Sequence, residues 1–100
     1  MARIIWAEPA LQELDEIAEY ISLDDPAAAK KLVRKAFERV DHLVRHPKSG
    51  KLIEEIEVSV YREILLPPCR IFYRIDDDIV YIIHVRREKQ LLHTDILKSR

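Results

Sequence analysis

Apolar residues recur at helical spacing through the first half of the chain and alternate with polar residues in the second half. Their spacing between positions 11 and 21 predicts an amphipathic helix with Pro9 in its first turn. A second helix is predicted to begin after Asp25, an N-cap residue, with Pro26 at the first helical position. Pro47 ends it, and the short connection between the two predicts an antiparallel helical hairpin. The apolar arc of the second helix consists of Leu32, Val33, Ala36, Phe37, Val40, Leu43 and Val44.

The remaining segments have the pattern of strands. The run "RIIW" predicts a short strand at residues 3–6, and three further strands are predicted at residues 61–66, 69–75 and 79–85, with turns at "PP" and "DDD". A weaker extended segment is predicted at 51–58, and residues 88–97 are expected to form a short helix or a tail across the sheet. We therefore predict one α+β domain over residues 1–100, in which an N-terminal strand and a helical hairpin pack on a twisted, mainly antiparallel sheet of about four strands.

Alternation along the last two predicted strands indicates which side chains face the helices. A three-residue turn would place Ile75 opposite Ile79, and Arg70 would then lie opposite His84. The predicted core face holds Cys69, Ile71, Tyr73, Ile75, Ile79, Tyr81, Ile83 and Val85. The predicted outer face holds Arg70, Phe72, Arg74, Val80, Ile82, His84 and Arg86.

This outer face has two interpretations. The cations Arg70, His84 and Arg86 are suited to bind phosphates or a carboxylate-rich partner helix. Alternatively, arginine stems simply cover apolar surface on a solvated face. Exposed Phe72 and Ile82 beside arginines favour a protein contact.

Composition indicates a globular chain with charge segregated along it. The chain has 100 residues, of which 48% are hydrophobic and 35% charged, and its net charge is −1. Residues 1–25 hold one basic and seven acidic side chains, whereas residues 26–52 hold eight basic and two acidic ones. We expect the acidic and the basic helix to pair along their shared edge. The basic segment suits a local anionic contact, but the total charge is not that of a general nucleic-acid binder.

Few residues have the pattern of a catalytic or metal site. A single cysteine, Cys69, excludes an internal disulfide, favours the cytoplasm, and is interpreted as a small buried residue rather than a nucleophile. His42 and His46 have helical ligand spacing but no third ligand, so we expect no metal and no cofactor. The first apolar run is too short for a membrane segment. His93 is either a surface histidine or a general acid–base.

Four segments, taken in order, resemble the RelE/ParE superfamily of bacterial toxins. They are "PALQELDEIAEYI", "DDPAAA", "LVRHPKSG" and "REILLPPCRIFYRIDDDIVYIIHVRREKQLL", which together cover nearly the whole chain. The resemblance implies a helical hairpin on an antiparallel sheet, the layout that the pattern predicts independently. It also implies neutralisation by an antitoxin from the same operon. RelE-like members cleave mRNA on the ribosome, whereas ParE-like members poison DNA gyrase.

The resemblance implies different residues for the two activities. The family's arginine on the second long strand matches Arg70, and a second arginine after the last strand matches Arg86 or Arg87. The lysines of the RelE-like branch are replaced by Tyr61 and Glu63, and its C-terminal tyrosine has no match. A remnant nuclease site would use Arg70, Arg86, His93 and Glu63, with Glu54 as another carboxylate.

The "PAAA" helix opening and the long hairpin favour the ParE-like branch. We therefore predict a cytoplasmic toxin that inhibits DNA gyrase by protein contact, with a ribosome-dependent mRNA endoribonuclease as the alternative. A binding domain without toxicity is a third hypothesis. The resemblance and the outer face together predict a target and antitoxin contact surface made of Arg70, Phe72, Arg74, Ile82, His84, Arg86 and Arg87.

Overall fold

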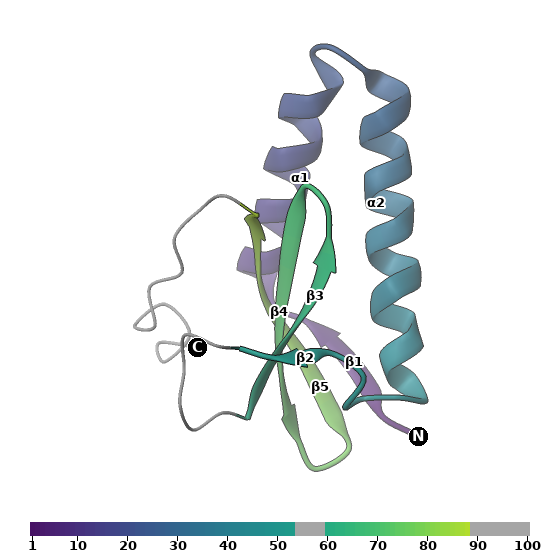
Figure 1. The fold of residues 1–100 in the computed structure, drawn as a ribbon, viewed down its shortest axis with the longest axis vertical. Helices are drawn as coiled ribbons and strands as arrows, with labels where there is room; N and C mark the ends of the chain where they lie inside the picture. The colour runs from purple at the N-terminus through teal and green to yellow at the C-terminus, as the bar shows by residue number, and fades with distance from the viewer. Residues whose placement is uncertain (54–59, 89–100) are drawn as a thin grey trace.

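The computed structural model describes residues 1–53 and 60–88 (Figure 1). A short strand comes first, two helices follow, and the remaining strands come last, in the order that the sequence predicts. The elements are β1 (Arg3–Trp6), α1 (Glu8–Ser22), α2 (Pro26–Asp41), the 3₁₀ helix η1 (His42–Val44), β2 (Lys51–Leu52), β3 (Tyr61–Leu66), β4 (Cys69–Asp76) and β5 (Ile79–Arg87).

The strands form one mixed sheet in the order β1-β5-β4-β3-β2. β1 runs parallel to β5, whereas the β2–β3, β3–β4 and β4–β5 pairs are antiparallel. The two helices lie next to each other as an antiparallel pair, joined by a short connection at the top of Figure 1. The predicted α+β class is therefore confirmed, and β1 brings the number of strands in this sheet to five.

The local signals that predicted the helices have direct structural counterparts. The carboxylate Oδ1 of Asp25 accepts a hydrogen bond of 3.0 Å from the backbone N–H of Ala28, so it caps the first turn of α2. Pro26 occupies the first turn, where its missing N–H leaves no helical hydrogen bond unmade. Each helix buries one stripe of its surface, made of Ala10, Leu14, Ile17 and Ala18 on α1 and of Ala29, Leu32, Ala36 and Val40 on α2.

The predicted face of β4 is confirmed, but the predicted face of β5 is wrong over its first five residues. Ile71 and Tyr73 have no exposed surface and pack in the main core. The turn contains two residues rather than three, with Asp77 at φ 55°, and it pairs Ile75 with Val80. A one-residue shift in register moves every side chain to the opposite face. Val80 and Ile82 therefore lie in the core, whereas Ile83 lies in a second cluster.

A bulge restores the predicted face at the end of β5. The pairing shifts between Phe72 and Tyr73, so that Tyr73 pairs with Ile82 but Ile71 pairs with Val85. Val85 therefore returns to the main core, as predicted. Bulges bend a strand and change where its side chains point.

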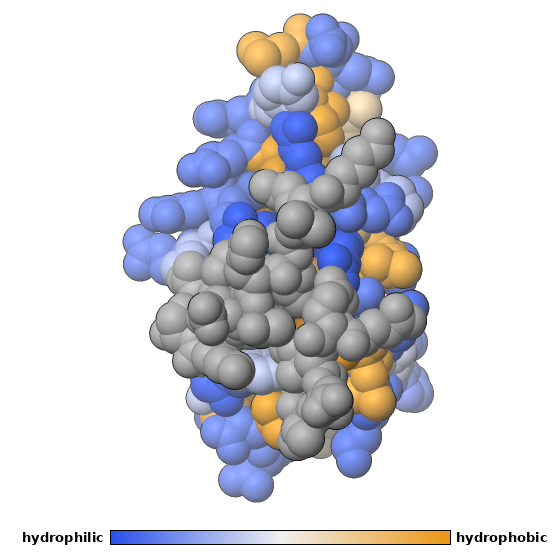
Figure 2. Space-filling model, turned by 60° about the vertical axis from the view of Figure 1, so that its left-hand side comes forward, coloured by the Kyte–Doolittle hydropathy of each residue, from blue (hydrophilic) through white to orange (hydrophobic). Residues whose placement is uncertain are grey.

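The outer face of the sheet has a small apolar cluster of its own. Phe72 has no exposed surface and packs with Ile53 and Ile83, and Tyr61 and Tyr81 lie against this cluster. The prediction that Phe72 is exposed on this face is therefore wrong. Figure 2, in which one side of the molecule is turned forward, shows mainly hydrophilic described surface with scattered apolar patches. In the described ranges, no helix has the length and apolarity needed to cross a bilayer.

Candidate functional site

The outer face carries an ion pair between Glu63 of β3 and Arg70 of β4. The guanidinium atoms Nε and Nη2 of Arg70 lie 3.0 Å and 2.6 Å from Oε2 of Glu63. The Arg70 side chain is 13% exposed and that of Glu63 only 6% exposed. The guanidinium also lies 4.8 Å from the ring centroid of Phe72. Arg70 is thus on the predicted face, but it is bound to a carboxylate rather than extended into solvent.

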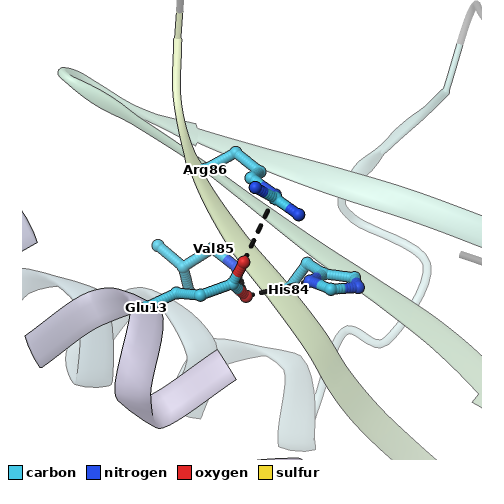
Figure 3. A network of polar contacts seen from close by, with 4 residues as sticks. All are labelled: Glu13, His84, Val85 and Arg86. Atoms are coloured by element: carbon cyan, nitrogen blue, oxygen red, sulfur yellow. Dashed lines mark hydrogen bonds and ion pairs between the residues drawn. The ribbon is translucent and has the colours of Figure 1, made fainter. Parts of the chain in front are cut away.

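A second polar network joins α1 to the end of β5 (Figure 3). Oε1 of Glu13 lies 2.9 Å from Nδ1 of His84 and accepts a hydrogen bond of 3.2 Å from the backbone N–H of Val85. Oε2 of Glu13 forms an ion pair of 3.2 Å with Nε of Arg86. His84 itself has no exposed surface. The carboxylate of Glu13 therefore contacts three groups of β5, namely the imidazole of His84, the backbone N–H of Val85 and the guanidinium of Arg86.

Glu13 takes the place that a neighbouring strand would otherwise fill. β1 pairs with β5 only as far as Ile82, and the chain then leaves the sheet to begin α1. The backbone N–H of Val85 lies beyond that point and is satisfied by Glu13. Unsatisfied backbone donors at a sheet edge cost free energy and invite pairing with another chain. Glu13 therefore seals part of this edge.

Sequence reasoning did not identify Glu13, although the sequence holds a signal for it. Position 13 lies three residues after Ala10 and four before Ile17, both of which are buried. These spacings place Glu13 beside the buried stripe of α1 rather than on the exposed acidic face. A carboxylate in such a position needs a partner from another element.

Two further arginines pack on aromatic rings. The guanidinium of Arg74 lies 4.2 Å from the ring centroid of Tyr81 and 3.7 Å from the carboxylate of Asp76. The guanidinium of Arg87 lies 4.3 Å from the ring centroid of Tyr20, which projects from α1. A cation over an aromatic face gains electrostatic stabilisation.

The predicted contact surface is only partly brought together. Ile82 is in the main core and His84 is fully buried, so neither is exposed as predicted. Arg70 lies opposite Arg86, and His84 lies opposite Phe72, which corrects the predicted pairing of Arg70 with His84. The predicted residues that keep accessible surface are Arg70, Arg74, Arg86 and Arg87, here called the arginine group. His93 and Glu54 lie outside the described residues.

A small hollow adjoins the arginine group. It has a volume of about 200 Å³ and is lined by Glu13, Glu16, Ile17, Val85, Arg86 and Arg87. Its wall contains both carboxylates and guanidinium groups, so its charge is mixed. In the part of the chain that the structure covers, no cluster of three or more histidine, cysteine or carboxylate side chains is arranged to hold a metal.

The cysteine does not have the environment of a nucleophile. Cys69 is 1% exposed, and burial raises the pKa of its thiol from 9.0 to about 11, although the nearby charge of Arg87 opposes this shift. The thiolate is the reactive form, so a raised pKa makes the group inert near neutral pH. The interpretation of Cys69 as a buried residue on the core face agrees with this burial.

Sequence comparison finds bacterial toxins. Residues 4–92 match a family model described as the ParE toxin of the type II toxin-antitoxin system, parDE. Toxin RelE2 of Caulobacter vibrioides is 30% identical over 92 residues, which cover 91% of this chain and all of that protein. Putative toxin Y4kP of Sinorhizobium fredii is 38% identical over 90 residues, which cover 86% of this chain and 91% of that protein.

Solved structures have the same fold. A chain of the chromosomal ParDE system from P. aeruginosa superimposes with a TM-score of 0.72 at 24% identity, covering 87% of this chain and 96% of that one. A chain of the toxin-antitoxin complex RelBE2 from Mycobacterium tuberculosis superimposes with a TM-score of 0.58 at 24% identity, covering 86% and 96%. At 24% identity, this similarity shows only that these proteins share the arrangement of helices and strands.

Proposed function

The chain belongs to the ParE toxin family of type II toxin–antitoxin systems, and on this basis we propose that it inhibits DNA gyrase by direct protein contact and that a cognate antitoxin neutralises it. The arginine group is the contact surface in this proposal. Its members lie on β4 and β5 and keep accessible surface, which suits recognition of a carboxylate-bearing protein.

The observation that carries the proposal is the Glu63–Arg70 ion pair. A nuclease would need Arg70 to hold a phosphate and a carboxylate to accept a proton from the 2′-hydroxyl. Here the two groups neutralise each other at 2.6 Å, with little exposure of either. Such a pair is better suited to stabilise the contact between β3 and β4 than to bind and cleave a phosphodiester. This favours a protein contact as the route to toxicity.

The antitoxin follows from the family and from the related assemblies. The similar P. aeruginosa structure is of a chromosomal ParDE toxin-antitoxin system, and the similar Mycobacterium tuberculosis structure is of the toxin-antitoxin complex RelBE2. For this chain, the cognate antitoxin is expected to place acidic side chains over the arginine group and apolar side chains over neighbouring exposed apolar surface. Covering the arginine group would then block access of the target.

A supercoiling assay with purified gyrase tests the proposal. We expect the toxin to inhibit supercoiling and the antitoxin to restore it. Arg87→Ala should weaken inhibition, because it removes an accessible cation of the arginine group, whereas Arg3→Ala should not, because this exposed arginine lies on β1. Unchanged supercoiling at micromolar toxin, with no accumulation of cleaved DNA, would reject gyrase as the target.

The second candidate function is ribosome-dependent cleavage of mRNA. One observation favours it, because Arg70 and Arg86 lie opposite each other on β4 and β5 and could converge on one phosphate. One similar protein is also named Toxin RelE2. In this chain, the candidate residues for mRNA cleavage are Arg70, Arg86, Glu63 and His93. Primer extension on cellular mRNA after toxin expression distinguishes the two candidates, since codon-linked cuts would support the nuclease and an intact message would exclude it.

A growth experiment distinguishes the third hypothesis, a binding domain without toxicity, from the two toxic functions. Expression of the chain alone should arrest growth, and co-expression of the neighbouring antitoxin gene should restore it. Normal growth at a confirmed level of folded protein would contradict toxicity altogether.

A further inference from the structure

Three cations of α2 form a row on one side of the helix. Lys31, Lys35 and Arg39 follow one another at intervals of four residues, which places their side chains on a common face. All three are exposed. His42 and His46 continue the same face beyond α2, with their rings stacked at a centroid distance of 4.7 Å. We call Lys31, Lys35 and Arg39 the basic row.

The basic row has no carboxylate partner within residues 1–53 and 60–88. Glu38, the acid nearest to it in sequence, lies 4.0 Å from Arg34 on the neighbouring side of α2. The acidic helix α1 does not compensate the row either, because Glu13 binds β5 and no ion pair joins α1 to α2 in these ranges. The electrostatic pairing of the two helices that the sequence suggested is therefore not formed there. The positive charge of the row faces solvent.

The row leads into a polar hollow between α2 and the sheet. This hollow has a volume of about 400 Å³, and its lining includes Arg39, His42, Ser49, Lys51 and Glu63. Glu63 would repel an anion, but its charge is compensated by Arg70 at 2.6 Å. Among the described residues of the lining, Arg39 and Lys51 are cationic and Ser49 carries a hydroxyl donor. The hollow therefore suits an anionic group.

The loop beside this hollow is held in place from the sheet. Nη1 of Arg62 donates hydrogen bonds of 3.1 Å and 2.8 Å to the backbone carbonyls of Lys48 and Gly50. The phenol of Tyr73 donates to the carbonyl of Pro47 at 2.8 Å and accepts from the N–H of Gly50 at 2.9 Å. Ser49 and Lys51 are thus presented by a fixed backbone, which reduces the ordering cost of binding.

The chemistry of the row points to a polyanion. Cores of protein interfaces are apolar and aromatic and are depleted of lysine, whereas the row holds only cationic side chains. It also lacks the aromatic rings on which single-stranded bases stack. From Lys31 to Arg39 the helix rises about 12 Å, a length that spans about three phosphates at 3.4 Å per strand step.

We propose that the basic row binds the phosphate backbone of double-stranded DNA, without reading its sequence, and that the adjoining hollow receives one phosphate. The binding itself does not depend on the target of the toxin. Its role in toxicity rests on the proposed function, because gyrase acts on DNA. The row lies on α2, apart from the arginine group on β4 and β5, so both surfaces can be occupied separately.

Fluorescence anisotropy with a labelled duplex of about two helical turns tests the proposal. With three phosphate contacts, the logarithm of the association constant should fall with a slope of about −2.7 against the logarithm of salt concentration. Affinity should therefore fall about 40-fold between about 50 and about 200 mM salt.

The double variant Lys35→Gln/Arg39→Gln should reduce that slope to about −0.9, so that the same change in salt weakens binding only about 3-fold to 4-fold. Its matched control is Lys30→Gln/Arg34→Gln, which changes the net charge equally on the neighbouring side of α2 and should keep the wild-type slope. Circular dichroism confirms that both variants are folded. If the salt dependence of DNA binding decreased equally in the two variants, or if the wild-type chain did not bind DNA, the proposal would be overturned.

Two competitors test the assignment to double-stranded DNA. Polyglutamate at equal charge should displace the chain from the duplex less effectively than unlabelled DNA does, and stronger displacement would indicate an acidic protein partner instead. Tighter binding of a duplex RNA would overturn the assignment to DNA. Failure here is distinct from failure of the proposed function, because inhibited supercoiling without DNA binding by the chain would reject only the basic row.

Discussion

Glu13 on α1 contacts His84 on β5 at 2.9 Å, and the histidine has no exposed surface. The same carboxylate accepts the N–H of Val85 and pairs with Arg86, so one helix side chain satisfies the strand where β1 has ended. The contact joins residues 71 positions apart in the sequence. It ties the helical hairpin to the strand that carries two members of the arginine group.

Glu13→Ala is expected to lower the free energy of unfolding by about 1–3 kcal/mol. The substitution leaves the buried side chain of His84 and the backbone N–H of Val85 without their acceptor, and unsatisfied buried donors carry that cost. Urea denaturation followed by circular dichroism measures it. Glu19→Ala, which removes an exposed acid from the same helix, should change the free energy by no more than about 0.5 kcal/mol. Equal effects of the two substitutions would show that Glu13 is only a solvated side chain.

Arg70→Ala is expected to destabilise the fold rather than leave it intact. Its side chain is 13% exposed, and its loss would leave Glu63, at 6% exposed, as a poorly solvated charge without its partner. Removing one member of a buried pair typically costs about 3–5 kcal/mol, so the residual exposure suggests about 2–4 kcal/mol here. The double variant Glu63→Leu/Arg70→Met should be more stable than Arg70→Ala, because it removes both charges of this pair and does not leave the Glu63 carboxylate without Arg70. Chemical denaturation of both variants checks this, and a double variant no more stable than Arg70→Ala would contradict the argument.

The elements with local signals could be predicted from the sequence. Asp25 and Pro26 mark the start of α2 because capping and the proline ring act within one helical turn. The paired prolines and the aspartates around Asp77 mark the two hairpin turns because turn chemistry is equally local. The four segments that resemble the RelE/ParE superfamily, and the order in which they occur, also predicted the family, and the match over residues 4–92 confirms it.

The register of β5 and the partners of the outer face could not be predicted from the same patterns. Ile79, Tyr81 and Ile83 alternate with Val80 and Ile82, so either set of apolar side chains can face a core. Only the length of the turn and the bulge at Phe72 decide between them, and neither has a distinctive local signature. The burial of His84 depends on Glu13 from another element, which no local pattern specifies.

Gly50→Ala is expected to destabilise the loop between η1 and β2. A Cβ at this position would lie closer than 3.0 Å to the hydroxyl oxygen and two ring carbons of Tyr73, a separation that real Cβ atoms essentially never show. Tyr73 cannot easily yield, because it is fully buried and its hydroxyl is hydrogen-bonded to Pro47 and Gly50. Overpacking of this kind costs about 1–3 kcal/mol. Thermal unfolding measures the effect, with Ser49→Ala at the neighbouring exposed position as the control. A Gly50→Ala protein as stable as that control would contradict the close packing.

Stability is expected to fall at alkaline pH because of Cys69. Burial raises the pKa of its thiol from 9.0 to about 11 in the folded state. Between these values the unfolded chain loses the proton while the folded chain retains it, so the unfolded state binds fewer protons and stability decreases as pH rises. A shift of about two units corresponds to at most about 3 kcal/mol.

The Cys69→Ala variant isolates this contribution. Urea unfolding of the wild-type chain and of Cys69→Ala should be compared between pH 8 and pH 11 on the minute timescale. The variant is expected to be less stable near neutral pH, because it loses buried sulfur, but its stability should fall less steeply with pH. Burial also raises the pKa of Tyr73, but this residue is present in both proteins, so its effect cancels in the difference. Parallel pH curves for the two proteins would show that the thiol titrates alike in the folded and unfolded states.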